Sequence, residues 1–329
     1  MTPTSPSPQD PLNSHRDEPN PPTNGHRSGF ACFVGRPNAG KSTLTNALVG
    51  EKVAIASDKP QTTRHIVRGI VTRSDGQLVI MDTPGVHRPR TLLGERLNQL
   101  VYDTWSEVDI IGVCLPCPER IGPGDRYLIG EIAALSHRPT LVALATKLDL
   151  ASSKDQVTRH LLDIQSLESE LGITWSEIVP VSATSGENLV LLRDLLINHL
   201  PEGPAYYPDG EVTDQPTETL ITELIREVAL AEVRQELPHS IVVTIDEMGL
   251  RPDRAPDKPL LDIYANLIVE RDSQKPIILG RQAARLKLIG TEARARITRL
   301  VGTPVHLDLK VKVEKEWQRN PKALNRLGF

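Results

Sequence analysis

The sequence predicts an α/β domain with a mainly parallel sheet, followed by a smaller α+β domain. Short apolar runs alternate with helix-like segments from residue 30 to residue 199. The glycine-rich stretch GRPNAGKS lies between the first apolar run and the first helix-like segment, and a Pro- and Gly-rich stretch ends the alternation at 200–216. Because strands that alternate with helices pair in parallel, we expect one sheet with helices on both faces.

The apolar runs of the first domain predict strands, and the segments between them predict helices. Ser-Asp-Gly at 74–76 separates two of the runs and predicts a hairpin, which makes one strand pair antiparallel. We expect strands at 30–34, 66–73, 77–81, 108–115, 140–146 and 177–181, and helices at 41–49, 92–106, 124–136, 155–171 and 187–199.

The second domain shows a different order of elements. After the interruption, an amphipathic run at 217–237 and alternating runs at 239–248 and 260–271 predict a helix and two strands. A helix pair around a glycine turn at 278–302 and a last strand at 304–314 complete an α-β-β-α-α-β order. The expected divisions are a disordered Pro- and Ser-rich tail (1–28), a first domain (29–200), a linker (201–216) and a second domain with a C-terminal extension (217–329).

Charge is unevenly distributed along the chain. The 329 residues carry a formal net charge of −4, yet residues 277–329 hold 12 Lys and Arg against 4 Asp and Glu. A basic module on an acidic body suggests an anionic partner, either nucleic acid or a membrane surface, whereas a solvated helix face is the alternative. No apolar run approaches the length of a membrane span, and three cysteines, an odd number, suit a reducing cytoplasm.

The stretch GRPNAGKS fits the phosphate-binding pattern G-x-x-x-x-G-K-[ST] in its expected place between a strand and a helix. Its backbone N–H groups and the helix N-terminus favour phosphate. Lys41 is expected to reach the β- and γ-phosphates, and Ser42 to bind Mg²⁺. The expected phosphate-binding residues are Gly35, Arg36, Pro37, Asn38, Ala39, Gly40, Lys41 and Ser42.

Four later segments are expected at the same edge of the sheet, because ligands of open α/β sheets bind at the carboxyl ends of strands. Asp82 is placed to hold Mg²⁺ through water, the Gly85 N–H to sense a γ-phosphate, and Thr63 to close on the metal as part of an ordered switch. The segments comprise the switch residues Gln61, Thr62, Thr63, Arg64 and His65, then Asp82, Thr83, Pro84, Gly85 and Val86, then Thr146, Lys147, Leu148 and Asp149, and finally Ser182, Ala183 and Thr184.

The five segments together are similar to the five G motifs of the translation-factor-related GTPases. The stretches KPQTTRH, MDTPGVH, LIVERDSQKPIILG, LKLIGTEAR, PVHLDLKVKVEKEW and LNRLGF resemble the Era family of GTPases over roughly residues 28–329. This resemblance implies slow, Mg²⁺-dependent hydrolysis of GTP to GDP by a P-loop GTPase domain, followed by a KH domain of the second type. It also implies a cytoplasmic monomer that binds the 3′ end of 16S-type ribosomal RNA, acts in assembly of the 30S subunit and contacts the inner membrane face peripherally.

One letter of the base-recognition motif departs from the family pattern, which is Asn-Lys-x-Asp. Asp149 is expected to accept two hydrogen bonds from guanine, and the Lys147 stem to cover the base. Thr146, in place of Asn, lacks an amide, so we expect binding weakened by about 1 kcal/mol with the preference for guanine kept. The alternative role for Asp149 is a helix N-cap.

A second departure concerns catalysis. Val86 stands where many GTPases have a water-orienting Gln, so hydrolysis is expected to depend on Lys41, Thr63 and Gly85, or on a partner. Asn38 is expected either to hold a K⁺ ion beside the phosphates or only to brace the loop.

In the second domain, GRQA departs from the G-x-x-G clamp of KH domains. Gly280 is kept, Ala283 replaces the second Gly, and Arg281, Arg285 and Lys287 are the expected phosphate contacts. The alternatives to an rRNA-binding GTPase are a GTP-gated scaffold that docks on protein or membrane, and a GTPase of another pathway such as tRNA modification.

Overall fold

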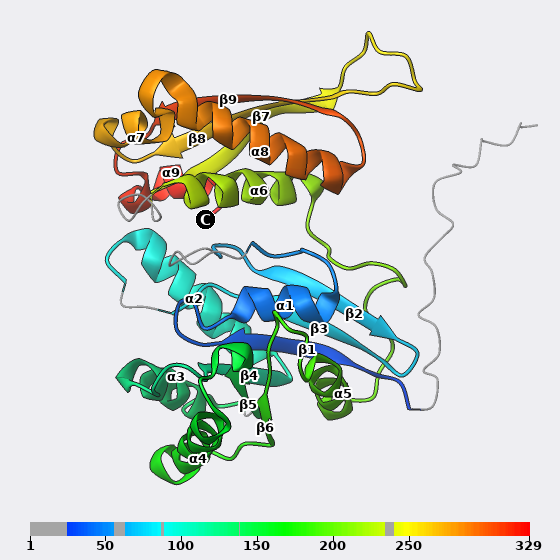
Figure 1. Cartoon of the computed structure of the whole chain (residues 1–329), viewed down its shortest axis with the longest axis vertical. Helices are drawn as coiled ribbons and strands as arrows, with labels where there is room; N and C mark the ends of the chain where they lie inside the picture. Colours follow the sequence, from blue (N-terminus) through cyan, green and yellow to red (C-terminus); the bar gives the residue numbers. More distant parts are fainter. Residues whose placement is uncertain (1–24, 56–62, 87–88, 138, 234–239) are drawn as a thin grey trace, which may run out of the picture.

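The structure, a computed structural model, describes residues 25–55, 63–86, 89–137, 139–233 and 240–329. Two domains lie one above the other along the long axis of the molecule (Figure 1). The lower one contains a six-stranded sheet in the order β2-β3-β1-β4-β5-β6. Its strands are β1 (Arg27–Val34), β2 (Val67–Arg73), β3 (Gly76–Asp82), β4 (Ile110–Pro116), β5 (Thr140–Thr146) and β6 (Glu177–Pro180).

The predicted mainly parallel sheet is confirmed. Only β2 is antiparallel, and it forms the expected hairpin with β3. Side chains of β1 alternate between two cores, with Phe33 on one face and Cys32 on the other. Because both faces are covered, the strands read as continuous apolar runs.

Helices cover both faces of this sheet. One core contains residues of α1 (Lys41–Val49) and α5 (Leu189–His199). The other contains residues of α2 (Leu92–Glu107), α3 (Pro123–Ala133) and α4 (Lys154–Leu171). The loops that follow the parallel strands therefore share one edge, where the predicted segments meet.

The second domain has the predicted α-β-β-α-α-β order. Helices α6 and α8 cover one face of a sheet in the order β7-β8-β9, in which β8 and β9 are parallel. A short helix not expected from the sequence, α9, follows near the C-terminus. The elements are α6 (Thr217–Glu232), β7 (Val242–Leu250), β8 (Leu261–Val269), α7 (Lys275–Leu279), α8 (Ala284–Val301), β9 (Val305–Val313) and α9 (Pro321–Arg326).

The domain edges differ from the expected divisions in two places. Strand β1 begins at Arg27 and Ser28 is buried, so the prediction of a disordered tail is wrong for these two residues. Residues 1–24 of the predicted tail lie outside the described residues. The expected linker 201–216 is hydrogen-bonded to the first domain: the buried Gln77 Oε1 accepts from the Tyr206 and Tyr207 N–H groups at 2.7 and 2.9 Å. Strand β2 is an edge strand, so one side of its backbone is free to pair with the linker. On that side Ile70 N donates to Val212 O at 2.9 Å.

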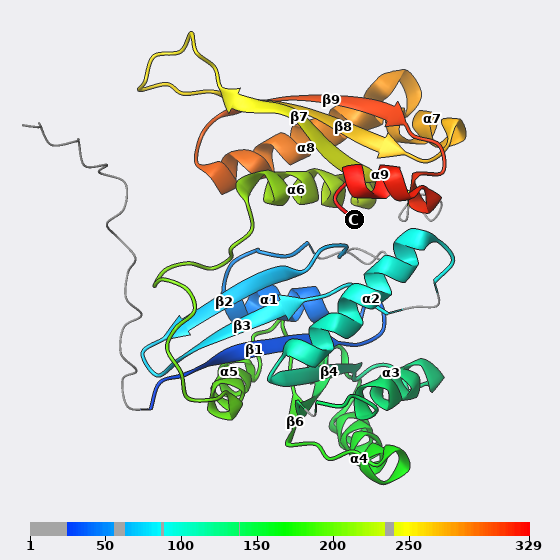
Figure 2. The same cartoon turned by 180° about the vertical axis from the view of Figure 1, so that it is seen from behind.

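The C-terminal segment joins the two domains. Figures 1 and 2 both show the C-terminus between them. Leu93 and Leu97 of α2 pack in one buried cluster with Trp317 and Leu324. Among the described residues, no helix combines the length and apolarity needed to cross a bilayer.

Candidate functional site

The phosphate-loop residues 35–42 form a tight turn between β1 and α1. A Cβ added to Gly35 would lie 2.8 Å from the Cys114 carbonyl oxygen, and Gly40 has a φ of 95°, so both positions favour glycine. Asn38 also has a positive φ, of 65°. The Lys41 ammonium curls back over the loop and donates to the carbonyl oxygens of Gly35 at 3.0 Å and Arg36 at 3.2 Å.

Three oxygen side chains predicted to hold Mg²⁺ lie together beside this lysine. Ser42 Oγ donates to Asp82 Oδ2 at 2.7 Å, Thr63 Oγ1 donates to the same oxygen at 3.2 Å, and the two hydroxyl oxygens are 3.2 Å apart. Burial raises the pKa of the Asp82 carboxyl and lowers the pKa of Lys41. Asp82 Oδ1 is buried and has no hydrogen-bond partner within the described part of the chain. A hard cation with oxygen ligands fits this set.

The base-recognition segment is tied to the phosphate loop and to the loop after β6. The buried Thr146 hydroxyl donates to the Ala39 carbonyl oxygen at 2.8 Å, and Ser182 Oγ donates to Asp149 Oδ1 at 2.6 Å. Thr146, Lys147 and Asp149 border a cavity of about 150 Å³. Its other lining residues are Gly40, Thr43, Leu44, Leu150, Val181, Ala183 and Thr184.

Thr43, Leu44, Leu150 and Val181 were not expected in this cavity. A helix places Thr43 and Leu44 directly after the phosphate loop, so the 3.6-residue period is the signal that could have found them. The alternative role for Asp149 is wrong: it lies in a 3₁₀ turn at Leu148–Leu150, and the N-cap of α4 is Ser153, which accepts from Gln156 N at 3.2 Å.

The remaining predicted residues lie around the same edge of the sheet. Thr83 and Pro84 are buried behind Asp82, and a Cβ on Gly85 would lie 3.6 Å from Lys41 Nζ. Val86 packs against the core beneath α2, α3 and α4. Gln61 and Thr62 lie outside the described residues.

Three consecutive switch residues connect this site to the second domain. Thr63 reaches Asp82, as described above. Arg64 is buried, donates to the Ile241 carbonyl oxygen at 2.8 Å and lies 5.7 Å over the Trp317 ring. His65 stacks on Phe329 with ring centroids 4.9 Å apart, and burial lowers its pKa.

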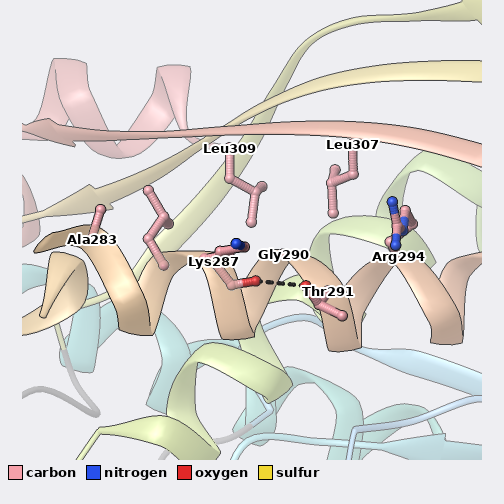
Figure 3. Close-up of a pocket in the computed structure, with 8 residues that line it drawn as sticks. Ala283, Lys287, Gly290, Thr291, Arg294, Leu307 and Leu309 are labelled. Atoms are coloured by element: carbon pink, nitrogen blue, oxygen red, sulfur yellow. Dashed lines mark hydrogen bonds between the residues drawn. The ribbon is translucent and has the colours of Figure 1, made fainter.

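A groove in the second domain lies between α8 and β9 (Figure 3). Leu307 and Leu309 form its apolar wall, and Lys287 and Arg294 lie along its helical wall. Thr291 Oγ1 donates to the Lys287 carbonyl oxygen at 2.9 Å. The groove holds about 320 Å³ and is also lined by Ala283, Leu286 and Gly290.

The predicted RNA-contacting residues behave differently from one another at this groove. Lys287 lines it, and Arg281 is exposed in the turn before α8. Arg285 instead donates to the Ile277 carbonyl oxygen, which fixes the turn. Gly280 adopts φ 68° and ψ −177°, and Ala283 is left-handed with φ 59°, a conformation that costs a non-glycine residue about 1 kcal/mol or more. Arg294 also lines the groove and was not predicted, although it follows Lys287 at the i+7 position of one helix face.

Comparisons with known proteins agree with this two-domain arrangement. A family described as 50S ribosome-binding GTPase matches residues 30–147, and a KH domain family matches residues 236–318. The chain is 62% identical to GTPase Era of Nocardioides sp. over 94% of this chain and 98% of the relative. It is 61% identical to GTPase Era of Streptomyces coelicolor, over 92% of this chain and 95% of the relative.

Two solved structures resemble the whole fold at 34% identity, and each match covers 92% of this chain and 99% of the other. The first, with a TM-score of 0.85, is a tyrosine-to-alanine variant of Aquifex aeolicus Era bound to GDP and AlF4⁻. The second, with a TM-score of 0.86, is Era in complex with MgGDPNP and nucleotides 1506–1542 of 16S ribosomal RNA. With its P-loop GTPase domain and its KH domain, the chain belongs to the Era family of GTPases.

Proposed function

We propose that GTP binds across the phosphate loop, with its phosphates at Lys41 and its base in the cavity beside Asp149. The observation that carries this assignment is the convergence of Ser42, Thr63 and Asp82 on one point next to Lys41. Asp82 Oδ1, which has no hydrogen-bond partner among the described residues, supports a cation there. Once phosphate is present, the Lys41 ammonium exchanges two backbone carbonyl oxygens for phosphate oxygens, which removes much of the cost of its burial.

Hydrolysis at this site depends on positioning and on charge. Mg²⁺ held by Ser42, Thr63 and Asp82 would neutralise charge that develops on the phosphates. Lys41 and the Gly85 N–H stabilise the γ-phosphate, and Asn38 would hold a K⁺ ion that supplies further positive charge for the phosphates. Because the Val86 side chain has no group that orients water, turnover is slow without a partner.

The nucleotide assignment is tested by Asp149→Asn. The carboxylate accepts from the N1–H and N2–H₂ edge of guanine, and an amide instead matches xanthine. We expect affinity for GDP to fall by about 10⁴-fold, as in sites that lose a buried polar match, while affinity for XDP rises. Asp155→Asn, on the first turn of α4 next to the loop, is the matched control and should leave both affinities unchanged. Unaltered GDP preference in Asp149→Asn would refute the base site.

We also propose that the KH domain binds single-stranded small-subunit rRNA in the groove between α8 and β9 and that the protein acts in 30S subunit assembly. The related structure that holds a 16S rRNA fragment supports this partner. The groove supports it chemically, because Leu307 and Leu309 offer an apolar wall for bases while Lys287 and Arg294 offer charge for phosphates.

Titration of this RNA tests the proposal. The probe is an RNA with the sequence of 16S nucleotides 1506–1542, the segment bound in the related structure. Lys287→Gln and Arg294→Gln should each weaken binding and reduce the salt slope by about one. Arg299→Gln on the same helix is the control, because Arg299 faces the cavity between the domains instead. Salt-independent binding, or none, favours the scaffold alternative, and equal affinity for tRNA favours the alternative of tRNA modification.

We further propose that the nucleotide state reaches the KH domain through Thr63, Arg64 and His65. Thr63 senses the metal site, whereas its two neighbours in sequence are held by Ile241, Trp317 and Phe329. A shift of Thr63 toward Mg²⁺ therefore pulls directly on contacts with the second domain. Peripheral contact with the inner membrane face and a monomeric state remain predictions from the resemblance, tested by vesicle sedimentation and by light scattering.

A further inference from the structure

Glu119 lies between the phosphate loop and the base-recognition loop. It belongs to the connection between β4 and α3, outside all five predicted segments. Its Oε2 accepts from Arg36 Nη2 at 3.2 Å, and its Oε1 lies 3.6 Å from Lys147 Nζ. One carboxylate therefore contacts a cation from each loop.

The Arg36 end of this bridge is fixed by a buried partner. Arg36 Nε donates to Asp125 Oδ1 at 2.7 Å, and the Asp125 side chain is almost fully buried. The other Asp125 oxygen accepts from Gly122 N at 2.8 Å, at the N-terminus of α3. Because Asp125 is immobilised on both sides, Arg36 presents its second guanidinium nitrogen to Glu119 in a fixed direction.

The Lys147 end of the bridge has a strained backbone. Lys147 has a φ of 55°, which is unfavourable for a residue with a side chain. The Thr146 hydroxyl bond to Ala39 and the Leu148 N–H bond to Val181 O at 3.3 Å hold the backbone on either side of it. Among the described residues, Glu119 pairs with the Lys147 ammonium, and this contact directs the Lys147 side chain.

We propose that Glu119 is a positioning residue for guanine-nucleotide binding. It holds the Lys147 ammonium toward the phosphate loop, so that the lysine stem lies over the base cavity before nucleotide arrives. The Thr146 hydroxyl makes one hydrogen bond from the base-recognition loop to Ala39 of the phosphate loop. Glu119 adds a second connection between these two loops. This inference rests on the proposed nucleotide site.

The expected effect of removing the Glu119 charge is small because the three charged side chains are partly exposed to solvent. The side chains of Arg36, Glu119 and Lys147 are 33, 43 and 30% exposed, so salt screens their attraction. Partly exposed charge pairs have small effects. We expect Glu119→Gln to release GDP about threefold faster at low salt and at the parental rate near 1 M salt.

The experiment measures the release of a fluorescent GDP analogue by stopped flow, in parent and variants, at low and high salt. Glu170→Gln is the matched control: Glu170 pairs with Arg126 at 2.6 Å with exposed fractions of 43 and 38%, but on α3 and α4 away from the nucleotide cavity. Lys147→Met provides the second background, because Glu119 acts through the Lys147 ammonium.

We expect Glu119→Gln to release the GDP analogue faster only at low salt and Glu170→Gln to release it at the parental rate. In the Lys147→Met background, Glu119→Gln should have no further effect. Parental release in Glu119→Gln, an equal change in Glu170→Gln, a change that persists at high salt, or full additivity with Lys147→Met each overturns the proposal. A failure of the nucleotide site itself appears elsewhere, as unaltered guanine preference in Asp149→Asn.

Discussion

Thr146→Asn introduces the residue of the family pattern at a position where the structure shows which hydrogen bond threonine makes. The Thr146 hydroxyl already donates to the buried Ala39 carbonyl oxygen at 2.8 Å, so the tie to the phosphate loop is kept. An asparagine amide reaches one atom further, and its second N–H and its oxygen remain available to the base edge. One net hydrogen bond stabilises by about 1 kcal/mol, so we expect roughly fivefold tighter GDP binding.

Removing the hydroxyl of Thr146 should weaken GDP binding. Thr146→Val keeps the shape but removes the donor to Ala39 O, which at about 1–3 kcal/mol corresponds to a loss of roughly fivefold or more. Thr104→Val is the control, because the buried Thr104 hydroxyl also donates to a carbonyl oxygen, that of Leu100, at 2.8 Å but on α2. Calorimetric titration of GDP and ADP checks all three variants. Weaker GDP binding in Thr146→Asn, or tighter ADP binding, would show that an amide at this position makes no added bond to the guanine edge.

Three other perturbations test separate parts of the site. Ala283→Gly relieves the left-handed backbone at φ 59° and should raise the free energy of unfolding by about 1 kcal/mol and tighten RNA binding; equal denaturant midpoints would contradict this. Burial lowers the pKa of His65, so its neutral form stabilises the stack on Phe329 above pH 6.5 and this stability is lost as pH falls through the lowered pKa. Between about pH 7 and pH 5, the unfolding temperature should therefore fall less for His65→Phe than for the parent. An equal fall of the unfolding temperature in both proteins would argue against this. GTP turnover should be faster in K⁺ than in Na⁺, and Asn38→Ala should abolish the difference; equal parental rates in the two salts remove the proposed ion.

Most of the first domain was predictable because its strands are buried on both faces and its helices follow one period. The phosphate loop, Asp82 and Asp149 could be predicted to lie together because each stands at or directly after the end of a strand, and these ends share one edge of the sheet. Leu150 and Val181, which adjoin the predicted segments 146–149 and 182–184, also line the cavity beside Asp149 but were not predicted. They supply shape, and no sequence pattern marks a side chain whose only role is shape.

The contacts between the domains were not predictable. The pairing of Arg64 with Ile241 and of His65 with Phe329 joins residues far apart in sequence, and no local propensity carries that information. The same holds for the expected linker, whose backbone hydrogen bond from Ile70 to Val212 depends on which strand forms the edge of the sheet. Gln282 and Ala283, directly before α8, are left-handed with φ of 51° and 59°; the sequence showed the departure at Ala283, but this backbone conformation required the structure.

Transmission of the nucleotide state to RNA binding through residues 63–65 can be measured as one ratio of affinities. The affinity for RNA with the sequence of 16S nucleotides 1506–1542 is measured with Mg²⁺ and GDPNP and again with Mg²⁺ and GDP. We predict binding that is tighter with GDPNP by about fivefold or more, the usual size of coupling between sites, and a ratio near one in Arg64→Ala. A ratio of one in the parent would show that residues 63–65 do not couple the two sites.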